Sequence, residues 1–246
     1  MKRTFILFSS AAVLLMIGSC KKSNDNANNS ATNLEIATMV SGSLAANSNG
    51  LSNISLDAVA NAKITVDLNP NCGSTKTYSF SRQSPQGATT TYSYAFNYTY
   101  TVNCNTSNQI DNVTISATDQ GSFDGPRLSS QNSGNLTAKI GGLTAASQIY
   151  SLSGEYKRTG AFTSKVDNKT SGTSAVDIVV SGIVVNKSTS TIASGSANFT
   201  VTGSTSTKGA INATGSLVFT GNNKATLIIN AVSYVVDLLT GDVTKS

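Results

Sequence analysis

The chain contains no histidine and no tryptophan, and charged residues make up only 12% of its 246 positions. Without histidine there are no Ser-His or Cys-His nucleophile pairs and no histidine metal sites. The Ser-x-x-Lys spacing of a serine-lysine nucleophile occurs only at Ser19–Lys22, and neither common glycine-rich phosphate loop is present. The sequence therefore favours a protein that is not an enzyme and that uses no cofactor.

Carboxylates are also scarce, with twelve Asp and Glu residues in all. A glycosidase needs two of them across a cleft. Glu155 alternates out of phase with the apolar residues of its segment Tyr150–Tyr156, which predicts an exposed partner for a Lys or Arg on a neighbouring strand. Segment Asp119–Gly125 offers oxygen ligands for Ca²⁺ but lacks the EF-hand spacing, so a plain turn without metal is favoured. A hydrolase is the least favoured function.

Positive charge is weak and scattered. The formal net charge is +5, and it falls to +3 once Lys2 and Arg3 are removed with the N-terminal segment described next. Nucleic-acid binding requires basic clusters, which the sequence lacks. Ser, Thr, Asn and Gly take the place of charged residues, a composition that is typical of extracytoplasmic β proteins.

The first twenty residues combine a basic head, an apolar run over Phe5–Ile17 and small residues before Cys20. The run is about thirteen residues, which suits a signal peptide and is short of the ~20 residues of a spanning helix. The segment resembles a bacterial lipoprotein signal peptide, residues 1–19. That resemblance implies that Cys20 is acylated, with chains such as palmitate, and anchors the protein at about 0.8 kcal/mol per buried methylene. An ordinary secretory signal, which needs no cysteine at the cut, is the alternative.

Behind the signal, residues 20–32 hold the lipidated cysteine and a polar stretch with almost no apolar residues, which predicts a flexible tether. Residues 33–246 are expected to form a single β-rich domain. Its first part, about 33–46, has apolar residues at three-to-four spacing and predicts a short helix with Asn33 as its cap. A further helical turn is expected around Leu56–Ala60.

From about Ala62 onward the apolar pattern changes to period two. Roughly ten to twelve strands are separated by Gly, Asn, Ser and Asp turns, without helices between them. This predicts a mostly β fold, an antiparallel meander shaped as a curved sheet, a half barrel or a sandwich. The apolar positions of the expected strands are Ile64-Val66-Leu68, Val113-Ile115-Ala117, Leu136-Ala138-Ile140, Tyr150-Leu152-Tyr156, Val176-Ile178-Val180, Ala197-Phe199-Val201, Ile211-Ala213-Leu217-Phe219, Ala225-Leu227-Ile229 and Tyr234-Val236-Leu238.

Two cysteines remain after Cys20, namely Cys72 and Cys104. In an exported protein they favour a disulfide over two free thiols. A hairpin that is symmetric about Ala88 places Tyr78 opposite Tyr98, Phe80 opposite Phe96 and Cys72 opposite Cys104. One register thus pairs the aromatic residues and the cysteines together.

The second strand of this hairpin carries an aromatic stripe on one face: Tyr92, Tyr94, Phe96, Tyr98 and Tyr100. Exposed tyrosines in a row form a platform for sugar rings or for an acyl ligand. Packing in the protein core explains the same pattern and is favoured. The stripe nevertheless gives the sharpest hypothesis for ligand binding.

Several features together resemble uncharacterised outer-membrane lipoproteins of the Bacteroidota. They are the lipobox, the Lys21-Lys22-Ser23-Asn24 tether, the two cysteines that flank the aromatic strand, and the chain end with Gly221-Asn222-x-x-Ala225 and Tyr234-x-Val236-Asp237-Leu238-x-Thr240-Gly241-Asp242. The resemblance implies an extracytoplasmic β domain at the outer membrane, on its periplasmic face or at the cell surface, and no known active site.

The leading hypothesis is therefore a lipid-anchored envelope protein, held to the membrane by its N-terminal acyl chains, that serves as a non-enzymatic structural or interaction module. Its partner would be an envelope protein or a glycan. The alternative is a glycan- or lipid-binding module that uses the aromatic face.

Overall fold

The computed structural model describes residues 31–68, 71–166 and 169–246. The predicted signal peptide, Cys20 and nearly all of the tether lie outside the described residues. The elements are α1 (Asn33–Leu44), the 3-10 turn η1 (Ala46–Ser48), α2 (Leu51–Leu68) and the strands β1 (Thr75–Gln83), β2 (Thr91–Cys104), β3 (Ile110–Asp124), β4 (Leu128–Gly141), β5 (Ile149–Ser164), β6 (Ser171–Asn186), β7 (Thr191–Thr205), β8 (Gly209–Gly221), β9 (Lys224–Ile229), β10 (Val232–Asp237) and β11 (Val243–Lys245).

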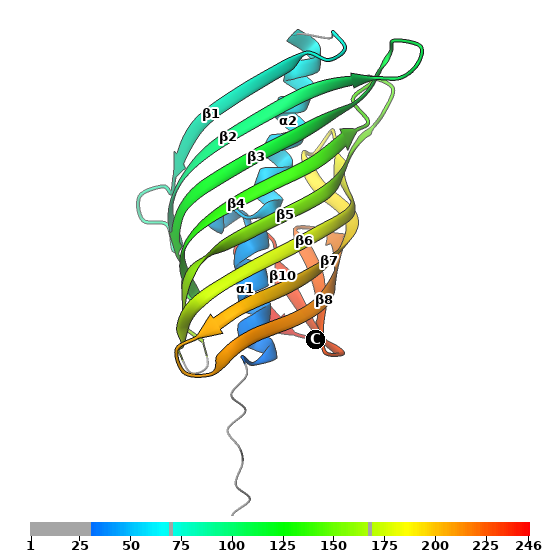
Figure 1. The fold of residues 1–246 in the computed structure, drawn as a ribbon. Coiled ribbons are helices and arrows are strands. Elements are labelled where there is room, and N and C mark those ends of the chain that lie inside the picture. The colour runs from blue at the N-terminus through cyan, green and yellow to red at the C-terminus, as the bar shows by residue number, and fades with distance from the viewer. Residues whose placement is uncertain (1–30, 69–70, 167–168) are drawn as a thin grey trace, which may run out of the picture.

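The eleven strands form one antiparallel sheet in the order in which they follow in the sequence, with β1 and β11 as its two edges. The sheet curves around both helices without closing, so that α1 and α2 follow one another along its long axis (Figure 1). This confirms the predicted antiparallel meander and selects a single curved sheet over a sandwich. We call the gap between the two sheet edges the seam.

The helix α1 begins at Asn33, which was predicted to be its cap, so the true cap lies one residue earlier. Thr32 is the N-cap residue, and a capping box joins it to Glu35: the Glu35 N–H donates to Thr32 Oγ1 at 3.2 Å, and the Thr32 N–H donates to Glu35 Oε2 at 2.8 Å. The Thr-x-x-Glu spacing satisfies two N-terminal donors at once, which Asn33 does not do. The helix itself is confirmed.

The helix α2 corrects two expectations. It spans Leu51–Leu68 rather than one turn around Leu56–Ala60, and it includes Ile64–Leu68, which was expected to be a strand. The alternation of Ile64, Val66 and Leu68 is misleading, because the residues of α2 that enter the core follow a three-to-four spacing instead. Ile64 and Leu68 themselves are 44% and 76% exposed. Short apolar runs do not distinguish the two periods.

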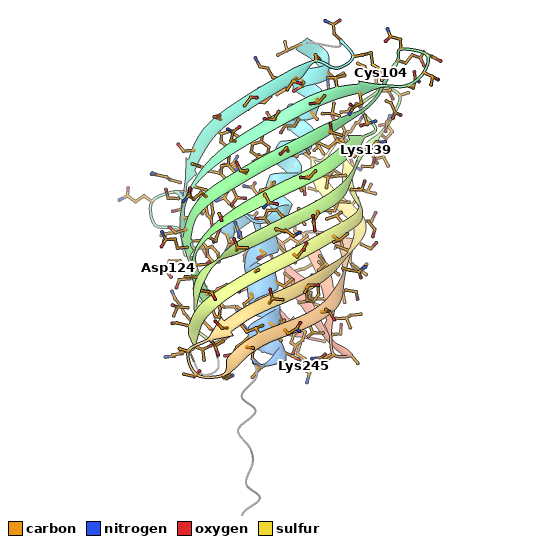
Figure 2. The ribbon with its side chains drawn as sticks, in the orientation of Figure 1. Cys104, Asp124, Lys139 and Lys245 are labelled. Carbon is orange, nitrogen blue, oxygen red and sulfur yellow. A yellow bond between two sulfur atoms is a disulfide. The ribbon has the colours of Figure 1, made fainter. Side chains whose placement is uncertain are left out.

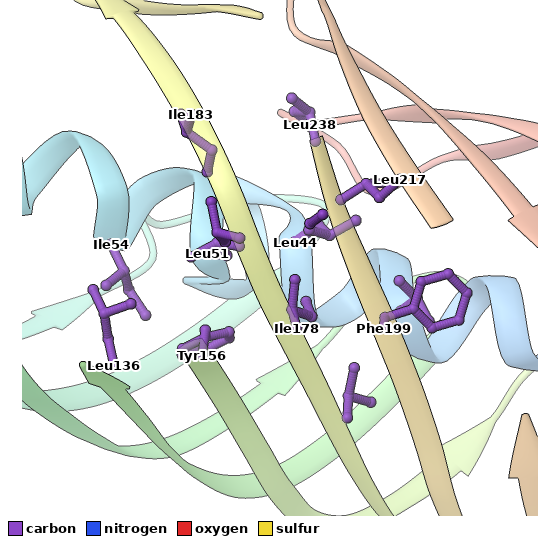
Figure 3. Packing of buried hydrophobic residues seen from close by; sticks show 14 of the residues in the cluster. Leu44, Leu51, Ile54, Leu136, Tyr156, Ile178, Ile183, Phe199, Leu217 and Leu238 are labelled. Carbon is purple, nitrogen blue, oxygen red and sulfur yellow. The ribbon is translucent and has the colours of Figure 1, made fainter. Parts of the chain in front are cut away.

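The core lies between the concave face of the sheet and the helices. Alternate residues of each strand point inward, and the remaining residues face water, as the period-two pattern predicts. Figure 3 shows Leu44, Leu51 and Ile54 of the helical part among sheet residues such as Leu136 and Ile178, all in one continuous cluster. The helices therefore cover the face of the sheet that a second sheet would cover in a sandwich.

The predicted β1–β2 hairpin is confirmed in its register. Tyr78 pairs with Tyr98, and Phe80 pairs with Phe96. Cys72 and Cys104 form a disulfide with a Cα–Cα distance of 5.5 Å, and Figure 2 labels Cys104 at one end of the sheet. The bridge joins the segment between α2 and β1 to the end of β2, next to the sheet edge.

Segment Asp119–Gly125 is not the plain turn that the sequence favoured. Residues up to Asp124 belong to β3. Asp119 points inward and is buried, whereas Asp124 points outward and pairs with Lys165. Because the two carboxylates lie on opposite faces of the sheet, they do not converge on one cation.

The expected turns near the chain end are present. Asn222 and Asn223 between β8 and β9, and Asn230 and Ala231 between β9 and β10, all have positive φ angles. Two successive residues of this kind form the tight hairpin turns that match strand twist.

Neither helix in the described ranges has the length and apolar character needed to cross a lipid bilayer.

Candidate functional site

The aromatic stripe does not form an open platform. Tyr94, Phe96, Tyr98 and Tyr100 are buried, with Tyr98 and Tyr100 at 0% exposure, and only Tyr92 stays partly exposed. The rings of Tyr98 and Tyr100 stack with centroids 6.1 Å apart. The stripe is thus part of the core against which the helices pack, so its buried members offer no face to a ligand.

Burial also changes the chemistry of these phenols. It raises the pKa of Tyr98 and Tyr100 far above the ordinary value, because the ionised form has no access to water. Tyr94 donates a hydrogen bond to Asn132 Oδ1 at 3.0 Å, and its pKa is likewise raised by burial. These hydroxyls are neutral at every physiological pH and act as packing groups.

Arg158 of β5 is a buried cation at the centre of the molecule. It is 4% exposed, and its guanidinium donates to three backbone carbonyls, those of Gly42 at 2.6 Å, Ser48 at 3.0 Å and Asn49 at 2.9 Å. These carbonyls lie at the end of α1 and in the connection to α2, where a helix leaves acceptors without partners. One sheet residue therefore fixes the bend between the two helices.

Asp119 of β3 lies near the same guanidinium, with Oδ1 3.9 Å from Arg158 Nη2. Burial raises the pKa of Asp119 above its ordinary value, and the Arg158 charge offsets only part of this effect. A Cβ at Gly134, opposite Asp119 on β4, would lie 2.2 Å from its Oδ2, so glycine makes room for the carboxylate. The arrangement serves structure: the carboxylate balances the charge of a buried cation that also donates to three carbonyls.

A second interior ion pair joins α1 to the sheet. Lys208, in the β7–β8 turn, donates to Glu35 Oε2 at 2.7 Å, and Thr170 donates to Glu35 Oε1 at 3.3 Å. Burial by itself raises the pKa of Glu35, but the hydrogen bonds from Lys208, the Thr32 N–H and Thr170 outweigh it and lower the pKa. Each of these two buried carboxylates thus lies next to a cation of the fold, Glu35 in direct contact and Asp119 at 3.9 Å.

A cavity with both polar and apolar lining residues lies at the seam. It has a volume of about 730 Å³ and sits between the β1–β2 turn and the β10–β11 turn, above η1. We call it the seam cleft. It is lined by Ala46, Asn47, Asn53, Arg82, Pro85, Ala88, Thr89, Thr90, Tyr92, Pro126, Leu239, Thr240 and Asp242.

Asn47 holds the two sides of the seam cleft together. Its Nδ2 donates to Thr90 Oγ1 at 3.0 Å on the β1–β2 side and to the Thr240 carbonyl at 2.6 Å on the β10–β11 side. The Asn47 backbone N–H also donates to the Leu239 carbonyl at 3.0 Å. The edges of the sheet do not pair, yet one side chain spans the gap between them, so the cleft is formed in advance of any ligand.

Arg82 supplies the only cation in the lining of this cleft, and its charge is balanced. Its Nη1 and Nη2 contact the two Asp57 oxygens at 3.1 and 3.2 Å, and the guanidinium lies over the Phe80 ring at 5.5 Å. These contacts orient the side chain, which lines the cleft and carries five N–H donors in all.

Of the residues that line the seam cleft, only Tyr92 was predicted from the sequence to contact a ligand. The cleft is assembled from five separate segments, and no spacing in the sequence relates them. For Glu155 the prediction is confirmed in part: it lies in β5 and contacts Lys157 at 2.7 Å, but Lys157 belongs to the same strand rather than to a neighbouring one. Lys157 in turn reaches Asp177 across the sheet at 3.2 Å.

Compared with protein families, with curated proteins and with solved structures, the chain gives no match.

Proposed function

We propose that this protein is a lipid-anchored lipoprotein of the cell envelope, at the outer membrane, and that it acts as a non-enzymatic structural or interaction module. Cys20 carries the acyl chains, and the folded domain stands off the bilayer on the segment that follows. The partner is an envelope protein or a glycan.

The observation that carries this proposal is the occupied interior of the sheet. A lipid-binding half barrel needs an apolar hollow on its concave side. Here α1 and α2 occupy that side, and Leu44 and Leu51 are fully buried against the sheet (Figure 3). This favours a rigid module that meets its partners with its surface over a carrier that encloses an acyl chain.

The positions of the buried carboxylates beside positive charges also support a non-enzymatic role. Glu35 and Asp119, the two interior carboxylates, face Lys208 and Arg158. A general acid or base must be free to exchange its proton with a substrate. Within the described ranges, Asp, Glu and Cys residues do not gather into groups of three that could hold a metal ion.

The anchor is tested by replacing Cys20 with alanine in the full chain, expressed in a bacterium that processes lipoproteins. We expect C20A to lose all labelling by an alkyne-tagged palmitate and to leave the membrane fraction, because Cys20 supplies the acylated thiol. In-gel fluorescence and fractionation measure both effects.

The matched control is C72A/C104A, which removes the other two cysteines and should keep full labelling. Undiminished labelling of C20A would refute the lipoprotein assignment. If only the control lost its labelling, the acyl group would be on Cys72 or Cys104 instead of Cys20.

A further inference from the structure

We propose that the seam cleft binds a neutral saccharide. The inference goes beyond the module proposed above, because it assigns a ligand class to a specific site. The cleft has a volume of about 730 Å³, within the 300–1,000 Å³ typical of small-molecule sites. The cleft shares only the partly exposed Tyr92 with the aromatic stripe, whose other rings are buried and exclude a ligand.

The charge of the cleft argues against an anionic ligand. Arg82 is neutralised by Asp57 in a two-point contact, so it offers hydrogen-bond donors without a net positive field. The other charged residue of the lining is Asp242, a single exposed carboxylate. An anion would meet this carboxylate without an unbalanced cation, whereas the hydroxyl groups of a neutral ligand can donate hydrogen bonds to it.

The polar groups of the cleft suit a ligand with several hydroxyls. Asn53 donates through Nδ2 to Asn49 Oδ1 at 2.8 Å, which fixes the amide and presents its other end to the cleft. Thr240 donates to Asp242 Oδ2 at 2.8 Å and so orients that carboxylate. Planar amide, carboxylate and guanidinium groups with set orientations form paired hydrogen bonds to neighbouring hydroxyls.

The lining of the cleft also has an apolar part, which would contact the C–H faces of such a ligand. The partly exposed ring of Tyr92 lies on one side of the cleft, and Leu239, which is 50% exposed, lies on the other. Pro85 and Pro126 stiffen the wall. A sugar ring has apolar C–H faces and a polar rim, so it matches a cleft with both kinds of group, whereas an acyl chain would leave the amides and hydroxyls without partners.

The test uses the full chain, purified in detergent, and a panel of glucose, galactose, N-acetylglucosamine and their β-linked disaccharides. Saturation-transfer NMR and titration should show saturable binding of at least one sugar, with a dissociation constant of about 0.1–10 mM for a single ring, because weak affinity is normal for so small a ligand. Sodium hexanoate and inorganic phosphate serve as the acyl and anionic probes.

Two variants locate the site. A88W fills the mouth of the cleft, and N53L removes an oriented amide; each should weaken binding at least tenfold. A210W is the matched control, because Ala210 is an exposed strand residue that lines none of the cavities described here. It should bind as the unmodified chain does. Circular dichroism establishes that all three variants keep the fold.

Three outcomes would overturn the inference. One is that no sugar of the panel binds. The second is that binding is unaffected by A88W, which would place the ligand elsewhere, for instance in the open hollows of about 530 and 630 Å³ on the outer face of β2–β5. The third is that hexanoate or phosphate binds more tightly than every sugar. None of these outcomes affects acylation of Cys20, so the two proposals fail separately.

Discussion

Replacing Arg158 with methionine should lower the free energy of unfolding by about 3–5 kcal/mol. Methionine fills a similar volume, but it leaves the buried carbonyls of Ser48 and Asn49 without the Arg158 donor, and the Gly42 carbonyl keeps only its hydrogen bond from Ser48 Oγ. It also leaves Asp119 without its cation. Each buried polar group that loses its partner costs about 1–3 kcal/mol. Urea unfolding followed by circular dichroism measures the loss.

Lys157, the neighbour of Arg158 in the chain, provides the matched control. It points to the opposite face of β5 and contacts Glu155 and Asp177 at the surface. Exposed ion pairs contribute little, so K157M should change the free energy of unfolding by less than about 1 kcal/mol. Equal effects of R158M and K157M would contradict the role that we assign to Arg158 in holding the helices.

Removal of the Cys72–Cys104 bridge is the second large effect. The bonded residues are 32 positions apart. By the chain-entropy model, a loop of this size contributes about 3.5 kcal/mol, and C72S/C104S should lose about that amount. The loss should begin at β1, which pairs with β2 on one side and is a sheet edge on the other.

Treatment with a reductant distinguishes the loss of the disulfide from local destabilisation caused by the two serine substitutions. Dithiothreitol should destabilise the unmodified chain to the level of C72S/C104S and leave the variant unchanged. Peptide mapping without reductant should also find Cys72 linked to Cys104. Two alkylatable thiols at these positions, or a variant as stable as the unmodified chain, would argue against a structural bridge.

The strands were predictable because alternation is a local property of the sequence. The hairpin register was predictable too, since one symmetry about Ala88 satisfied the aromatic and cysteine pairs together. For α2 the local signal was ambiguous: Ile64 and Leu68 fit a strand as well as a helix, and only packing on the sheet decides between them.

The burial of Asp119 and Arg158 could have been predicted from the alternation of inward and outward residues along their strands. Asp119 continues the inward series Val113-Ile115-Ala117, and Arg158 continues the series that ends at Tyr156. Charged residues in phase with a core face predict buried partners. The seam cleft had no such signal, because it depends on how the two ends of the sheet meet across η1.

The most direct test of this account is native-state hydrogen exchange of the full chain, resolved by peptide. If the helices are part of one filled core with the sheet, the buried amides of α1 and α2 should exchange with the same free energy as those of the central strands β4–β7, through global unfolding. Helices that exchange several kcal/mol more easily than those strands would contradict it, because the concave face would then open independently of the sheet.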